Sequence, residues 1–351
     1  MSERWRLAAP ARERLARAPG DDGLFLALAP MDGVTDAVYR ELLTDQDGGR
    51  SGISLCVSEF VRVCQDPVPP RILLDHCPEL ARGGHTRAGV PVAVQLLGGA
   101  PAPMAATAAR AAAMGAPAVD INFGCPAKTV NNHDGGAAIL RCPPRIRTIV
   151  AAVRDAVPPH VPVSAKIRVG WDSSADVEAI AAEAAAGGAA WITVHARTRA
   201  QGYAPPVEWP AIARARAAAG VPVIANGDLV TPADVARCAD ESACGAFMIG
   251  RGSMVDPHVF AALRGWRGGQ ATLAELAELW DDYHARMLAA GLSPGRALCR
   301  VKQWLRFGGD RRVDLHHLFA AVKTAATWDE ARASITRGVA PQPPAAARAS
   351  A

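Results

Sequence analysis

Eight short apolar segments recur between residues 24 and 260 of this chain, and an alanine-rich stretch long enough for a helix follows each of them. Strands that alternate with helices form parallel sheets, because a parallel neighbour needs a long crossover connection. Eight strand–helix units over about 240 residues suit a closed barrel better than an open doubly wound sheet. The sequence therefore predicts an α/β fold, a TIM (β/α)8 barrel. Its strands are expected to begin near Leu24, Ile53, Pro91, Ala118, Val161, Trp191, Val221 and Gly245.

The pattern changes after Phe260, where segments of helical periodicity follow one another without a strand between them. They are LAELAELWDDYHARML, ALCRVKQWLRFG, DLHHLFAAVKTA and WDEARASIT. Apolar residues at this spacing predict a small helical bundle. We therefore expect a flexible N-terminal extension over 1–22, the barrel over 23–262, the helical domain over 263–337 and a disordered tail over 338–351.

Composition and charge argue against several classes of protein. No apolar run is long enough to cross a bilayer, and the basic N-terminus lacks the apolar core of a signal peptide, so we expect a cytoplasmic protein with no membrane partner. The eight cysteines include no CxxC pair, which argues against metal binding and against a disulfide framework. The net charge is only +4, so attraction to a nucleic acid requires a local basic patch.

The segment VDINFGCPAKTVNN, residues 119–132, places a cysteine directly after a predicted strand. Val119 and Ile121 are typical of a buried strand, while Gly124 and Pro126 prevent regular structure from continuing past Cys125. Most cysteines are small buried hydrophobic residues, but a thiol on a strand-end loop is accessible. Because the catalytic groups of parallel barrels lie at the carboxyl ends of the strands, Cys125 is a candidate catalytic residue.

The other strand ends carry polar residues and glycines that are expected to meet Cys125 at the same end of the barrel. Glycine-rich loops after the seventh and eighth strands are typical of a phosphate-binding site, and an arginine beside them could clamp the anion. Taken singly, each glycine loop is better explained by a tight turn, but the two together favour the phosphate site. The strand-end residues are Pro30, Met31, Gln95, Asn122, Lys166, Arg168, His195, Arg197, Asn226, Gly227, Asp228, Gly250, Arg251 and Gly252.

Lys166 is one of only four lysines in a chain with 34 arginines. A lysine inside a strand is costly to bury, so a structural ion pair is one interpretation. The other is that its ammonium faces a flavin and stabilises negative charge at N1 of the reduced ring, with Gln95 and His195 hydrogen-bonding the ring. No GxGxxG motif follows a strand, so a nicotinamide donor would bind only transiently.

Seven of these strand-end segments together resemble the tRNA-dihydrouridine synthases: LAPMDGVTD, VQLLGG, VDINFGCPAKTV, VSAKIRVGWD, VHARTRAQGY, VPVIANGDL and MIGRG. The resemblance spans about residues 24 to 260 in order. SEFVRV, CPEL, GWDS and KQWL further resemble the bacterial branch that acts on uridine 16 of the tRNA D-loop. Ala196 and Phe123 depart from the family's usual residues without removing a functional group.

This resemblance implies an FMN-binding TIM barrel followed by a helical tRNA-binding domain, which together reduce the C5–C6 double bond of uridine with NADPH as reductant. Hydride would reach C6 from the flavin, while Cys125 would protonate C5 from the opposite face. Asn122 and Tyr203 would contact the target base. The implied FMN contacts are Pro30, Met31, Gln95, Lys166, His195, Asn226, Gly227, Asp228, Gly250 and Arg251.

A basic stretch in the helical region predicts contact with tRNA. Between Arg296 and Arg312 there are six basic residues and one acidic residue, a local balance of +5. A solvated helix face is the alternative for such a stretch. Next to the predicted barrel site, we expect Arg300, Lys302 and Arg306 to bind tRNA phosphates.

Three other functions are compatible with parts of this pattern. A dihydropyrimidine or dihydroorotate dehydrogenase-like FMN barrel acting on a free base would not need the basic helical region. A non-catalytic tRNA-binding protein would not need Cys125. A Cys–His hydrolase using Cys125 and His195 would not need two phosphate-type loops. We expect the protein to be a monomer.

Overall fold

The computed structural model describes residues 24–339, so the predicted extension over 1–22 and the tail beyond Val339 lie outside the described residues. The described chain divides into two compact units, one of residues 24–253 and 257–268 and the other of residues 254–256 and 269–339. The boundary between the two units lies between Gly268 and Gly269, whereas the sequence pattern predicts it between residues 262 and 263. Gly338 and Val339, assigned to the tail, belong to the last helix.

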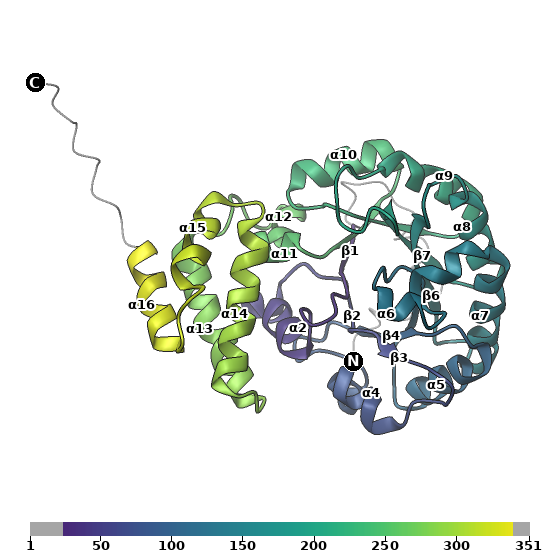
Figure 1. Ribbon diagram of the computed structural model, residues 1–351, viewed down its shortest axis with the longest axis horizontal. Coiled ribbons are helices and arrows are strands. Elements are labelled where there is room, and N and C mark those ends of the chain that lie inside the picture. The colour runs from purple at the N-terminus through teal and green to yellow at the C-terminus, as the bar shows by residue number, and fades with distance from the viewer. Residues whose placement is uncertain (1–23, 340–351) are drawn as a thin grey trace, which may run out of the picture. The chain divides into compact units, whose positions relative to one another are not determined.

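The first unit is a closed parallel barrel surrounded by helices, as predicted (Figure 1). All strands pair in parallel, and β2 pairs with both β1 and β4 to close the barrel. Each predicted apolar segment contains one strand. The strands are β1 (Phe25–Leu28), β2 (Leu55–Val57), β3 (Val61–Arg62), β4 (Val92–Leu97), β5 (Val119–Asn122), β6 (Val163–Gly170), β7 (Trp191–Thr198), β8 (Val223–Asn226) and β9 (Ala246–Ile249).

Strand β3 was not predicted, because two residues make no recognisable apolar run. It pairs with the last residues of β4, at Leu96 and Leu97, and so extends the sheet beside the barrel's carboxyl end. The barrel is therefore built from the eight predicted strands, with β3 as an addition at one edge.

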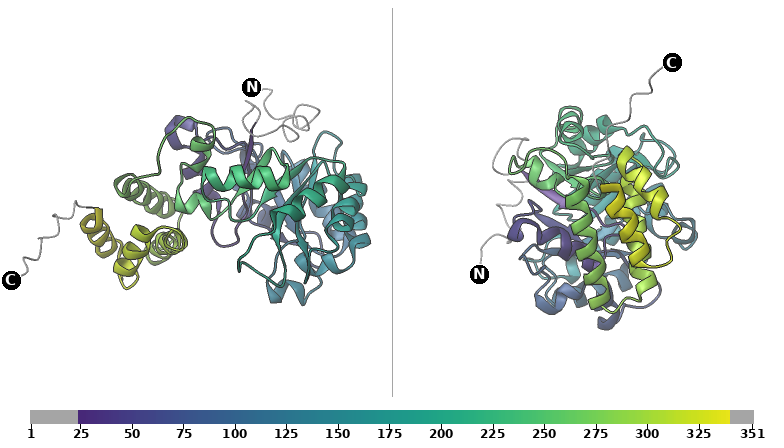
Figure 2. Two further views of the ribbon diagram at one scale, coloured as in Figure 1. Left: turned by 90° about the horizontal axis from the view of Figure 1, so that it is seen from above. Right: turned by 90° about the vertical axis from the view of Figure 1, so that its left-hand side faces the viewer.

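Alanine-rich helices cover the barrel, and their small side chains face inward. Helix α5 buries Met104, Ala108 and Ala111, and helix α8 buries Ile180, Ala181 and Ala184. The larger helices appear around the strands in Figures 1 and 2. The helical segments are α2 (Ala37–Thr44), α3 (Gln46–Gly49), α4 (Pro70–His76), η2 (Pro78–Arg82), α5 (Pro101–Ala113), α6 (Lys128–Asn131), η3 (Gly136–Arg141), α7 (Pro143–Ala156), α8 (Val177–Ala186), α9 (Trp209–Ala219), α10 (Pro232–Ser242), α11 (Gly252–Val255) and α12 (Val259–Leu263).

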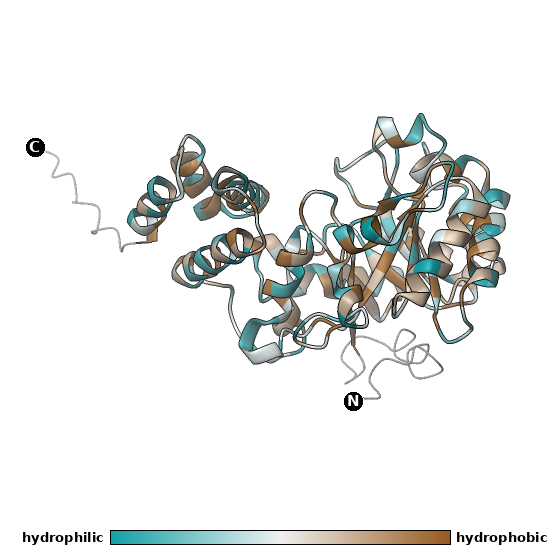
Figure 3. Cartoon of the chain, turned by 90° about the horizontal axis from the view of Figure 1, so that it is seen from below, coloured by the Kyte–Doolittle hydropathy of each residue, from teal (hydrophilic) through white to brown (hydrophobic). Residues whose placement is uncertain are grey.

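The barrel interior is apolar toward one end and polar toward the other. Because side chains alternate along a strand, every second residue points inward. Ala93, Ala118 and Trp191 belong to one apolar cluster inside the barrel, and Figure 3 shows the hydrophobic colouring of the strands. Two positions further along their strands lie Gln95, Asp120 and Thr193, all buried. The polar residues are thus gathered near the carboxyl ends of the strands.

The second unit is a bundle of helices, α13 (Leu273–Ala289), α14 (Pro294–Gly309), α15 (Val313–Val322) and α16 (Trp328–Val339). Trp280, Tyr283 and Trp304 are its largest buried side chains, and the rings of Tyr283 and Trp304 meet edge to face. Trp304 also donates its indole N–H to the Met254 carbonyl at 2.9 Å, which ties α14 to the segment 254–256. Among the described residues, no helix is both long enough and apolar enough to span a membrane.

Candidate active site

Cys125 lies on the loop after β5, where hydrogen bonds to its backbone N–H and to its carbonyl hold it in place. The Asn122 side-chain oxygen accepts the backbone N–H groups of Gly124 and Cys125, each at 2.9 Å. The Cys125 carbonyl accepts the Asn131 side-chain amide at 2.9 Å. A Cβ on Gly136 would lie 3.0 Å from Cys125, and the φ of +58° there also disfavours a side chain. Cys125 remains partly exposed, and its thiol is therefore accessible.

Burial sets the protonation state of Cys125. Loss of solvation raises the pKa of the thiol, and the nearby Asp32 acts in the same direction. The Ala127 N–H and the cations Arg168 and Lys166 act in the opposite direction but do not reverse the shift. Since an unperturbed thiol has a pKa of about 8.5, Cys125 is neutral at physiological pH. It is suited to donating a proton rather than to acting as a thiolate nucleophile.

Lys166 and His195 lie on adjacent strands in the polar part of the barrel. Lys166 donates to the Asn226 side-chain oxygen at 3.2 Å, and burial together with Arg168 lowers its pKa to about 8. Burial, with the cations around it, lowers the pKa of His195 well below its usual value, so the ring is neutral. The His195 Nδ1 atom is buried and has no hydrogen-bond partner among the described residues.

The residues predicted to bind phosphate follow the carboxyl ends of β8 and β9. Their charged side chains form ion pairs with one another or with Arg197. Asp228 accepts from Arg197 at 2.7 Å and from Arg251 at 2.7 Å. Arg197 is buried, while the Arg251 side chain is 29% exposed and can still reach a ligand. Asp228, predicted as a direct FMN contact, thus holds two arginines in position.

Two glycines at the same strand ends lie so close to neighbouring residues that a Cβ atom would make tight contacts. Gly227 has a φ of +123° and a Cβ there would lie 3.3 Å from Ala196. A Cβ on Gly250 would lie 3.2 Å from the Met31 sulfur. Pro30 and Met31 themselves lie in the turn after β1, both partly exposed, and the backbone N–H of Met31 donates to Thr35 Oγ1 at 2.7 Å.

Tyr203 lies on the loop after β7 and is 59% exposed. The guanidinium groups of Arg168 and Arg251 lie 5.3 and 5.4 Å from its ring centre, and the His195 ring meets it edge on at 6.2 Å. An exposed ring between two cations is suited to contact with a planar, electron-rich ligand. The structure brings Tyr203 beside His195, as expected of residues that share one site.

Arg168 is a site residue to which the sequence analysis gave no role. It is 3% exposed, and it donates to the carbonyls of Gly124 at 2.7 Å, Thr198 at 3.0 Å and Gly202 at 2.7 Å. It therefore joins the Cys125 loop to the Tyr203 loop. Its position two residues after Lys166 on one strand was a usable signal, because both side chains face the barrel interior.

Asn131 and Arg199 were also missed. Arg199 donates to the Asn131 side-chain oxygen at 3.0 Å, and its guanidinium lies 4.5 Å from the centre of the Trp171 ring. Asn131 in turn holds the Cys125 carbonyl. No sequence pattern distinguishes this asparagine from Asn132 beside it, since both lie at the end of a four-residue helix.

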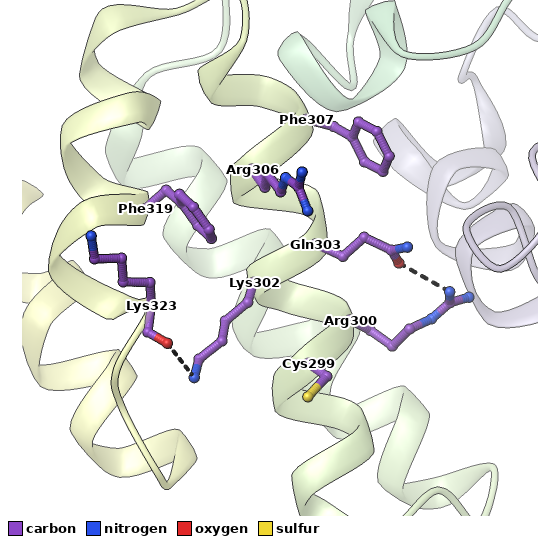
Figure 4. Close-up of a pocket in the computed structure, with 8 residues that line it drawn as sticks. All are labelled: Cys299, Arg300, Lys302, Gln303, Arg306, Phe307, Phe319 and Lys323. Atoms are coloured by element: carbon purple, nitrogen blue, oxygen red, sulfur yellow. Dashed lines mark hydrogen bonds between the residues drawn. The ribbon is translucent and has the colours of Figure 1, made fainter.

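The three predicted tRNA contacts line one pocket of about 460 Å³ on α14 and α15 (Figure 4). Arg306 is exposed, and Arg300 donates to the Gln303 side-chain oxygen at 3.1 Å. Lys302 is placed differently, because its ammonium donates to the backbone carbonyls of Lys323 at 3.1 Å and Ala325 at 2.6 Å. It holds the end of α15 as well as lining the pocket.

A second pocket of about 280 Å³ lies beside the Cys125 loop. Residues at or just after the ends of β3, β4 and α6 line it, and they include Arg62, Gly98, His133 and Asp134. None of the predicted FMN contacts belongs to it. Among the described residues, no group of three or more histidine, cysteine or acidic side chains is arranged to bind a metal ion, and all eight cysteines are free thiols.

Several known proteins are similar to this chain in sequence or in fold. A tRNA-dihydrouridine(16) synthase of Cupriavidus necator is 46% identical over 289 residues, which cover 80% of this chain and 87% of that protein. The protein of the same name from Haemophilus influenzae is 38% identical over 310 residues, covering 86% and 96%. Histamine dehydrogenase from Rhizobium sp. 4-9 has a TM-score of 0.51 at 13% identity, over 69% of this chain and 46% of that chain, a likeness of fold alone.

The sequence pattern of the family described as "Dihydrouridine synthase (Dus)" matches residues 27–332, which include the barrel strands and most of the helical bundle. Together with relatives that match over nearly their whole length, this establishes the family. The chain belongs to the dihydrouridine synthase family.

Proposed function

We propose that this chain reduces the C5–C6 double bond of uridine at position 16 of the tRNA D-loop, with FMN as bound cofactor and NADPH as reductant. The observation that carries the proposal is a partly exposed, neutral thiol at the barrel's carboxyl end, close enough to Lys166 and Arg168 for their charges to act on it. Reduction of a carbon–carbon double bond needs a proton donor at one carbon. Cys125 fills that role at C5.

The polar part of the barrel fits a flavin. Within the described residues, His195 Nδ1 is buried without a partner and the Lys166 ammonium donates one hydrogen bond, to Asn226, so both can bond a planar ring. The Lys166 ammonium would stabilise negative charge on the reduced pyrimidine ring. The partly exposed guanidinium of Arg251 suits the phosphate. A bound FMN would supply the two reducing equivalents.

The base would lie between the cofactor and the Cys125 loop. Asn122 fixes that loop, and Tyr203 offers an exposed ring beside it. A uridine within folded tRNA must first leave its stacked position, which costs a few kcal/mol. Contacts to the tRNA backbone have to offset this cost, and the basic pocket with Arg300 and Arg306 is suited to provide them. We further propose that the protein acts as a cytoplasmic monomer.

The direct test is Cys125→Ala in the full-length protein. We expect the variant to keep the flavin absorbance and to bind tRNA, while single-turnover formation of dihydrouridine falls at least a hundredfold, because the general acid is missing. Mass spectrometry of tRNA from cells lacking the protein should show loss of dihydrouridine at position 16. Full activity of the alanine variant would contradict the role of the thiol.

The same assays separate the alternatives. Turnover of a free pyrimidine in place of tRNA would support a dehydrogenase acting on free bases. Purified protein without flavin absorbance, and unable to take up FMN, would instead support a non-catalytic tRNA-binding protein.

A further inference from the structure

A buried carboxylate in the barrel interior binds side chains from the strands on either side of it. Asp120 on β5 accepts a hydrogen bond from Ser164 on β6 at 2.5 Å and from the Gln95 side-chain amide on β4 at 2.7 Å. The three residues face one another in the sheet register, and none is more than 2% exposed. Water does not compete for these bonds, so their geometry is fixed.

Two amide side chains continue from this carboxylate to the catalytic loop. The Gln95 side-chain oxygen accepts from the Asn122 side-chain N–H at 2.9 Å. The Asn122 side-chain oxygen then accepts the N–H groups of Gly124 and Cys125, each at 2.9 Å. One continuous chain of hydrogen bonds therefore joins Asp120 to the backbone of Cys125.

The direction of this chain is determined at its two ends, where Asp120 accepts and the N–H groups of the loop donate. A carboxylate oxygen accepts hydrogen bonds, so Gln95 must turn its NH2 group toward Asp120 and its oxygen toward Asn122. Asn122 must then turn its NH2 group toward Gln95 and its oxygen toward the loop. If Gln95 were inverted, the NH2 groups of both amides would meet, and inverting Asn122 in response would place donors against the N–H groups of the loop.

The protonation state of Asp120 leaves this direction unchanged. Burial raises the pKa of Asp120, while its bonds to Ser164 and Gln95 act against the shift. A proton on the oxygen that faces Ser164 would reverse that single hydrogen bond. The other oxygen would still accept from Gln95.

We propose that Asp120 is a positioning residue for the reaction, which orients the amides of Gln95 and Asn122 and thereby holds the Cys125 loop in its catalytic geometry. This inference rests on the proposed function for the role of Cys125. The competing interpretation is that Asp120 serves only as a buried negative charge near Lys166.

Two substitutions separate these interpretations. In Asp120→Asn the charge is lost, but the new amide can still accept from Gln95 and can donate to Ser164. In Asp120→Leu no acceptor remains, and the Gln95 amide loses the hydrogen bond that fixes it at the Asp120 end. We expect single-turnover dihydrouridine formation within about threefold of wild type for the asparagine variant and about five- to tenfold slower for the leucine variant, since one hydrogen bond of about 1–1.5 kcal/mol is at stake.

A second measurement reports on the conformation of the Cys125 loop and does not depend on the reaction. The rate of Cys125 alkylation by iodoacetamide is measured on tRNA-free protein by peptide mass spectrometry, with the exposed Cys142 in the same sample as internal control. We expect a changed rate at Cys125 and an unchanged rate at Cys142 in the leucine variant, and wild-type rates at both in the asparagine variant. Asp120→Ala replaces the leucine variant if the latter does not fold.

The outcomes decide between the two roles. Equal slowing of both variants, with unchanged Cys125 alkylation, would show that the charge alone matters and would overturn the proposal. Wild-type behaviour of the leucine variant would overturn it as well. If wild-type protein itself formed no dihydrouridine, the proposed function would fail, but the alkylation experiment would still decide whether Asp120 orients the loop.

Discussion

Burial shifts the pKa values of two groups at the active site in opposite directions. It raises the pKa of the Cys125 thiol and lowers the pKa of the Lys166 ammonium to about 8, because in each case it disfavours the charged form. At neutral pH the thiol therefore keeps its proton, and most Lys166 side chains keep their charge. Both groups are then in the form that the proposed reaction needs.

The first prediction concerns the pH dependence of the reaction. Since the ammonium form of Lys166 stabilises the reduced cofactor, the rate of uridine reduction should fall as pH rises through about 8. Single-turnover rates measured with prereduced enzyme on both sides of that pH test this. Lys166→Arg, whose guanidinium stays protonated, should move the decline to higher pH. A decline unchanged in Lys166→Arg would assign it to another group.

The lowered pKa of Lys166 also makes the stability of the folded protein depend on pH, in the opposite direction to the reaction rate. Because the pKa of Lys166 is lower in the folded protein than its ordinary value of 10.5, the unfolded chain binds more protons between about pH 8 and that value. The contribution of Lys166 to the free energy of unfolding therefore rises with pH in this range.

The second prediction concerns Arg168, whose guanidinium joins two active-site loops. Arg168→Lys keeps the charge but cannot reach the carbonyls of Gly124, Thr198 and Gly202 together. We expect a loss of about 1–3 kcal/mol in the free energy of urea unfolding and at least tenfold slower turnover. Arg237→Lys, at a 64% exposed side chain, should change stability by less than about 0.5 kcal/mol. Equal effects at the two sites would refute the prediction.

At the scale of elements, Lys302 on α14 stabilises the end of α15. Its ammonium binds the carbonyls of Lys323 and Ala325, which follow the last turn of that helix. A cation at a helix C-terminus is favoured by the helix dipole and satisfies carbonyls that have no partner within the helix. Lys302 therefore differs from Arg306, which is exposed on the same helix and makes no such contact in the described structure.

The third prediction follows from this contact. Lys302→Met should speed amide hydrogen exchange in α15 by about tenfold, because about 1–2 kcal/mol of local stability is lost. Lys323→Met is the matched control, since it removes one lysine from the same pocket but leaves the Lys323 carbonyl in place. We expect little change in that variant. Similar exchange in both variants would show that the contact does not stabilise the helix.

At the scale of the whole molecule, tRNA binding should depend on a local basic surface rather than on net charge, which is only +4. Arg300 and Arg306 line one pocket in the helical unit. Their contacts to phosphates would release counterions on binding, so affinity would fall with salt. An enzyme acting on a free base would show no such dependence on these residues.

The fourth prediction tests that surface. Arg306→Glu should weaken tRNA binding and reduce the slope of log affinity against log salt by about 0.7–0.9. Arg216→Glu changes the net charge equally at an exposed position on α9 and should leave the slope unchanged. Filter binding at several salt concentrations measures both. If the two variants lose affinity alike, net charge rather than the pocket governs binding.

Much of the fold was predictable because it depends on local patterns. The eight apolar segments were recognisable as strands since Val, Ile and Ala at such positions form the sheet and its packing surface. Strand β3 was not, because its two residues owe their conformation to pairing with β4. The boundary between the units lies after Gly268 and not after residue 262, as the sequence pattern predicts, because packing and not composition determines where a unit ends.

The sequence by itself determined which residues stand at the strand ends, and with them the thiol of Cys125, because strand ends follow from local apolar patterns. Only the tertiary structure decided how those residues pair. Arg168 contacts three carbonyls on two loops, Asp228 binds two arginines, and Asp120 connects to Cys125 through two amides. Partners in these contacts lie as many as 44 residues apart, and a hydrogen bond forms only where folding has placed a donor within reach of an acceptor.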